Sequence, residues 1–118
     1  MSYKKIINII QKIHTKTNND LIEWETTEES GIYQVSFSTY SIRISERQSY
    51  STPEEHDFII QIINNMGDIV EEVSDEDIAS SLEKAYHIMK STYELARRKA
   101  MGVDLALDTI LDELENEL

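Results

Sequence analysis

Two arginines and several hydroxyl side chains have types and spacing suited to binding a small anion. Most of them lie in two neighbouring runs where apolar and polar residues alternate, so the polar members project from one face of a sheet, and Arg47 lies just beyond the second run. Arginine forks and serine hydroxyls suit carboxylate or phosphate groups, and neither run places a carboxylate on this face. The candidate nucleotide or other anion site comprises Gln34, Ser36, Ser41, Arg43, Ser45, Arg47 and, in a loop able to close over it, Tyr50. The simpler interpretation, which we favour, is an exposed face whose arginines pair with acids elsewhere.

His56 is the centre of a second group of potential ligands, because Glu54, Glu55 and Asp57 surround it. A metal ion needs side chains that converge, whereas neighbours in an extended segment point in different directions. The other two histidines are isolated in the sequence. We therefore expect a solvated polar loop over residues 46–56 and no metal site.

Motifs for catalysis are absent from the sequence. It has no Gly-x-Ser-x-Gly, no phosphate-binding glycine loop and no dinucleotide fingerprint, and its three glycines are each explained by a turn or a helix cap. The lack of cysteine excludes a thiol nucleophile and thiolate zinc ligands, and it fits a cytoplasmic protein. We expect a protein that is not an enzyme and has no cofactor.

The net charge of the chain limits its partners. The 118 residues carry 23 acids against 11 Lys and Arg, a net charge of −12, although residues 1–20 alone carry +3. An acidic surface repels phosphates, so direct binding to nucleic acid is not expected, and a protein partner with a basic surface is. The apolar runs are short and no secretory signal is visible, so we expect no membrane segment.

The spacing of apolar residues predicts one α+β domain over residues 1–118, beginning with a helix and a sheet. Isoleucines at helical spacing predict a helix over residues 3–14, which the polar run 15–20 ends. Residues 21–73 predict an antiparallel meander of about five strands, since two runs alternate with period two and Phe58–Ile63 is apolar at both parities. The Asn-Asn-Met-Gly segment at 64–67 predicts a hairpin turn before an edge strand.

Residues 75–118 predict two helices. Ser74 is a good N-cap, the next three residues are acidic, and a stripe from Ile78 to Ala100 predicts one long helix of about seven turns. Gly102 ends this helix, and Asp104 begins a final short one.

The final helix predicts an interface. Its apolar stripe either folds back on the long helix or packs against another subunit. Basic residues at the end of the long helix would receive its acids, from the same chain or from another. The candidate interface residues are Arg97, Arg98, Leu107, Ile110, Leu111 and Leu114, and a homo-oligomer is expected.

Several short motifs, taken in order, resemble a family of small bacterial proteins with no established activity. They cover most of residues 24–112 and are Trp24-Glu25, Ser41-Ile42-Arg43-Ile44-Ser45, Ile69-Val70-Glu71-Glu72-Val73-Ser74-Asp75, Tyr93-Glu94-Leu95-Ala96-Arg97-Arg98-Lys99-Ala100 and Gly102-Val103-Asp104. The resemblance supports the α+β fold and assigns no catalytic residue.

These observations favour a small acidic interaction protein of the inhibitor, immunity or accessory-subunit type that self-associates. A module that binds a small anion on the Arg43 and Arg47 face is the alternative. A weaker alternative is an acidic mimic of nucleic acid, whose binding to a basic partner would fall steeply with salt.

Overall fold

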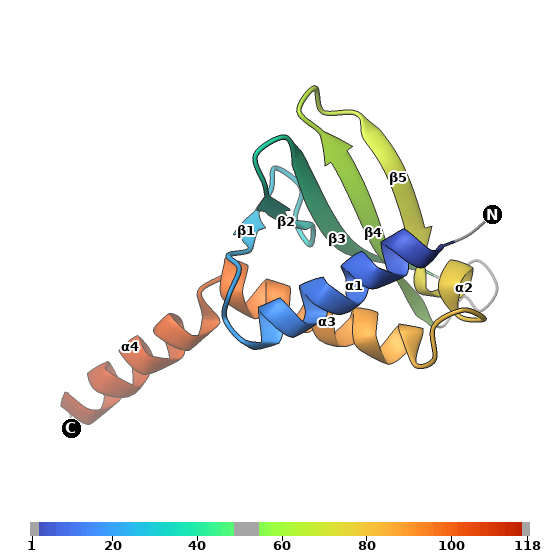
Figure 1. Cartoon of the computed structure of the whole chain (residues 1–118). Helices are drawn as coiled ribbons and strands as arrows, with labels where there is room; N and C mark the ends of the chain where they lie inside the picture. Colours follow the sequence, from blue (N-terminus) through green and yellow to red (C-terminus); the bar gives the residue numbers. More distant parts are fainter. Residues whose placement is uncertain (1–2, 49–54, 117–118) are drawn as a thin grey trace.

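The computed structural model describes residues 3–48 and 55–116 and has the predicted α+β fold (Figure 1). An N-terminal helix precedes a five-stranded antiparallel sheet, and helices complete the chain. The elements are α1 (Lys4–Asn18), β1 (Glu25–Thr26), β2 (Tyr33–Ser36), β3 (Tyr40–Gln48), β4 (His56–Asn64), β5 (Ile69–Ser74), α2 (Asp75–Ile78), α3 (Ala85–Ala100) and α4 (Val103–Asn116).

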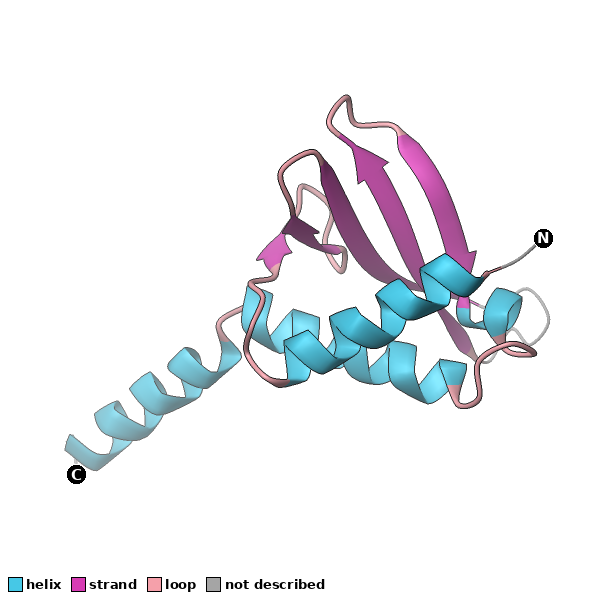
Figure 2. Ribbon diagram, viewed as in Figure 1, coloured by secondary structure: helices cyan, strands magenta, loops and turns pink. Residues whose placement is uncertain are grey.

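The sheet is a meander whose spatial order, β1-β2-β3-β4-β5, is the chain order (Figure 2). Its register aligns one row of buried residues across four strands, namely Tyr33, Ile44, Ile60 and Val73. The predicted alternation is therefore confirmed, since residues of one parity on each strand face the helices.

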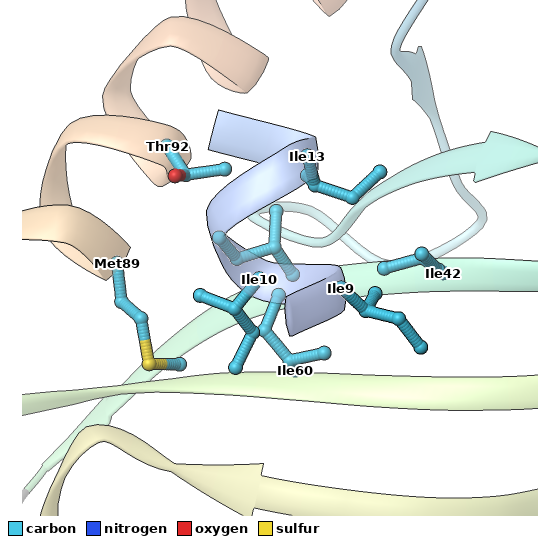
Figure 3. Close-up of a pocket in the computed structure, with 8 residues that line it drawn as sticks. Ile9, Ile10, Ile13, Ile42, Ile60, Met89 and Thr92 are labelled. Atoms are coloured by element: carbon cyan, nitrogen blue, oxygen red, sulfur yellow. The ribbon is translucent and has the colours of Figure 1, made fainter. Parts of the chain in front are cut away.

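Helices α1 and α3 cover that apolar face of the sheet (Figures 1 and 2). Figure 3 shows isoleucines of α1 pointing toward Ile42 and Ile60 of the sheet, with Met89 and Thr92 of α3 beside them. The pocket that these side chains line has no room for a water molecule, so the layer is well packed. Among the described residues, no helix combines the length and apolar character that crossing a membrane requires.

Helix α1 extends to Asn18, four residues beyond the predicted end. The polar residues after His14 stay helical because Thr17 is fully buried and its Oγ1 accepts a hydrogen bond of 2.9 Å from Trp24 Nε1. The helix ends where Asp20 adopts a left-handed φ of 59°. The strand predicted from residue 21 is reduced to Glu25–Thr26, while Trp24 serves as a core residue.

Replacing Thr17 with valine is expected to lower the free energy of unfolding by about 1–2 kcal/mol, because the shape is kept but the buried indole N–H loses its acceptor. Urea unfolding followed by the fluorescence of the single tryptophan measures this loss. Thr15→Val, on an exposed position of the same helix, is the matched control and should change little. Equal effects of the two substitutions would contradict the assigned hydrogen bond.

The polar loop predicted over 46–56 is shorter than expected. Strand β3 continues to Gln48 and β4 begins at His56, with Glu46 opposite Phe58 and Arg47 opposite Asp57. Asp57 is buried rather than solvated. Backbone pairing between long neighbouring strands thus overrides the polar composition that indicated a loop. Tyr50 and Glu54 lie outside the described residues.

The single long helix predicted after Ser74 is two helices. Ser74 does cap α2, and a reciprocal pair of hydrogen bonds joins Ser74 and Asp77, but α2 ends at Ile78. A turn follows, and Lys84 takes a left-handed φ of 62° before α3 begins. Ile78 and Leu82 are buried in the structure, as they would be in one continuous helix. Their apolar spacing therefore did not distinguish a continuous helix from this turn.

Candidate functional site

The polar face of the sheet brings four of the predicted ligand residues into one hydrogen-bonded network. Strand register places Gln34 opposite Arg43 and Ser36 opposite Ser41. Gln34 Oε1 accepts from Arg43 Nε at 2.7 Å, and Gln34 Nε2 donates to Ser36 Oγ at 3.1 Å. Ser41 Oγ also donates to Ser36 Oγ, at 3.3 Å. These side chains are thus held by one another.

Carboxylates from other elements reach both arginines of this face. Arg43 Nη2 lies 3.5 Å from Glu28 Oε1, and Arg47 Nη1 lies 3.7 Å from Glu72 Oε2. Gln61 Nε2 also donates to Glu72 Oε1, at 2.7 Å. The arginines of this face therefore pair with acids from other segments, as the simpler interpretation of the sequence expected. Ser45 lies on the same strand, opposite Ile59.

The cluster around His56 does not form a metal site among the residues the structure describes. His56 Nδ1 lies 3.2 Å from Glu46 Oε1 across the β3–β4 pair. Within residues 3–48 and 55–116, no three His, Asp or Glu side chains are grouped closely enough to hold a metal ion.

Asp75 is a buried carboxyl with a structural role. It is 6% exposed, and its Oδ1 accepts a 2.8 Å hydrogen bond from the backbone N–H of Phe58. Burial raises the pKa of the Asp75 carboxyl above its ordinary value, although the Phe58 N–H acts in the opposite direction. This contact fixes the first turn of α2 to β4.

Helix α4 projects from the rest of the molecule, and none of its described side chains is buried (Figure 1). Its apolar stripe is about half exposed: Leu107 50%, Ile110 52%, Leu111 56% and Leu114 56%. It does not fold back on α3. The predicted basic cluster meets only the start of α4, where Arg98 Nη2 contacts Asp104 Oδ1 at 2.7 Å, and Arg97 is exposed.

An apolar groove beside α1 was not predicted from the sequence. It has a volume of about 510 Å³; Ile9, Ile13, Phe37, Tyr40, Ile42 and Ile62 line it. Phe37 and Tyr40 are each 50% exposed, and Lys12 and Lys16 stand at its rim. A second hollow of about 550 Å³ shares Ile9 and Ile62 and follows α1 toward its N-terminus. The positive charge of residues 1–20 in an acidic chain was the one signal for this surface.

The fold and these surfaces define a small α+β protein with one projecting amphipathic helix. No family model, curated protein or solved structure matches the chain. The resemblance seen in the sequence motifs therefore stays a prediction.

Proposed function

We propose that this chain is a small acidic interaction protein, of the inhibitor, immunity or accessory-subunit type, which acts without catalysis and self-associates through α4. The observation that carries this proposal is the exposed stripe of α4. Four large aliphatic side chains, Leu107, Ile110, Leu111 and Leu114, share one face of a helix in which no described residue is buried.

An exposed stripe of this kind is unfavourable in water. An isolated helix of about 14 residues is marginally stable, and each aliphatic side chain gains about 1.5–3 kcal/mol when it is buried. Contact with another protein surface both orders α4 and removes its stripe from water. Its length and stripe are those of helices that bind in apolar grooves.

Charge supports an acidic helix that binds a basic surface. Helix α4 contains five acids and no base, and the whole chain carries −12. A partner with a basic surface would be attracted to α4 at long range. The polar sheet face does not favour a second function, because both of its arginines already contact a carboxylate.

The proposal is tested by the solution mass of the full chain in sedimentation equilibrium over a range of concentrations. We expect the wild-type chain to be larger than a monomer and the double variant Leu111→Gln, Leu114→Gln to be a monomer. Thermal unfolding of that variant, measured where both proteins are monomeric, should be unchanged, because no described residue of α4 is buried.

Leu105→Gln is the matched control for this experiment. Leu105 is 73% exposed on the same helix, but it lies two residues from Leu107 and therefore on the opposite face. The same substitution there should leave the association intact. A wild-type chain that is monomeric at every concentration would refute the proposal.

A further inference from the structure

We infer that the groove beside α1 is the surface that receives α4 of a second copy of this chain. This inference rests on the proposed self-association and names the receiving surface. The groove and the helix are separate parts of the molecule, and in Figure 1 α4 points away from α1 and the sheet. The groove of each copy is therefore open to the helix of another.

The apolar surfaces of the two parts match. The groove floor is made by Ile13 and Ile42, which are buried, and its rim by the half-exposed rings of Phe37 and Tyr40. With its continuation, the groove follows α1 from Lys4 to Lys16, about 18 Å at 1.5 Å per residue. The stripe from Leu107 to Leu114 spans about 11 Å by the same rise, so it fits within that length.

The charges of α1 and α4 are opposite, while the continuation of the groove also includes one acid, Glu71 of β5. Helix α1 contains four lysines and no acid, whereas α4 contains five acids and no base. Lys12 and Lys16 are one turn apart on the groove side of α1. Asp108 and Glu115 share one flank of the α4 stripe, because seven residues are close to two helical turns. Seating the stripe in the groove therefore allows this acidic flank to face the lysines.

A reciprocal exchange of helices gives the smallest closed assembly, a dimer. Each copy provides one helix and one groove, so an exchange in both directions closes a dimer around a two-fold axis. Such a dimer contains the contact between α4 and the groove twice. Its buried surface is therefore twice that of one contact, which brings it closer to the area that a stable interface needs.

A complementary charge swap tests the receiving surface. The groove variant Lys12→Glu, Lys16→Glu and the helix variant Asp108→Lys, Glu115→Lys should each raise the dissociation constant of their own dimer by about tenfold or more. Mixed in equal amounts, the two variants should form a heterodimer near wild-type affinity, because every groove then meets a helix of opposite charge. Sedimentation equilibrium with one variant fluorescently labelled measures all three constants.

Lys84→Glu, Lys90→Glu is the matched control, since it changes the net charge by the same amount at exposed positions outside the groove. This control should stay close to wild type. Far-UV circular dichroism verifies that each variant is folded. The inference is overturned if the groove variant dimerises like wild type or if the mixture does not associate.

The two proposals fail in different ways. If Leu111→Gln, Leu114→Gln abolishes the dimer and Lys12→Glu, Lys16→Glu does not, self-association through α4 stands, but the groove is not the surface that receives α4. A monomeric wild-type chain would overturn both.

Discussion

Replacing Phe58 with alanine is expected to lower the free energy of unfolding by about 3–5 kcal/mol, the usual cost of emptying a buried aromatic site. Phe58 is 2% exposed on β4. Its ring centroid lies 5.6 Å from that of Tyr86 and 5.4 Å from that of Tyr93, both on α3. The substitution thus removes two ring contacts between β4 and α3. The total stability of a domain is about 5–15 kcal/mol, so this loss is a large part of it. Urea unfolding followed by Trp24 fluorescence measures the loss.

Phe37→Ala is the matched control, because Phe37 is the only other phenylalanine and is 50% exposed. It should change the stability of the monomer by no more than about 0.5 kcal/mol, while weakening the association that we place in the groove. The comparison is made at a concentration where the chain is monomeric. Similar losses for the two substitutions would show that the assigned burial of Phe58 is incorrect.

The sheet could be predicted because its signal is local. A buried face repeats every second residue along a strand, and the row containing Tyr33, Ile44 and Ile60 displays that period. The ends of elements depend on distant contacts instead. Trp24 stabilises the last turn of α1 through Thr17, and no pattern in residues 15–18 indicates that partner.

The candidate sites were predictable to different extents. The spacing of the four apolar residues of α4 was enough to predict that they share one face. Whether the helix folds back on α3 depends on packing outside α4, so the sequence of α4 did not decide it. On the polar face, the sequence identified the residues that share the network, yet Glu28 and Glu72 come from other segments and were missed. The groove combines α1 with β3 and β4, so no single segment indicates it.

Two substitutions of Asp75 are expected to separate its role as a hydrogen-bond acceptor from the effect of its charge. Asp75→Ala should lower the free energy of unfolding by about 1–3 kcal/mol, because the buried N–H of Phe58 loses its acceptor. Asp75→Asn retains an oxygen at the same position and removes the charge. It should therefore keep most of the wild-type stability. Glu76→Gln, at the exposed next position, controls for the loss of one negative charge from the turn.

The pH dependence of the Asp75→Asn effect tests the raised pKa. Because burial raises the pKa of Asp75 in the folded chain, the unfolded chain loses this proton first as the pH rises. The stabilisation by the protonated carboxyl is complete below the unfolded pKa and is lost as the pH passes the folded pKa. The asparagine side chain does not titrate. The free energy of unfolding of the variant should therefore gain on that of wild type as the pH rises from below the ordinary pKa of an aspartate through the raised pKa of the folded chain. A gain by wild type over that interval would mean that the hydrogen bond from Phe58 outweighs burial and holds the carboxyl ionised.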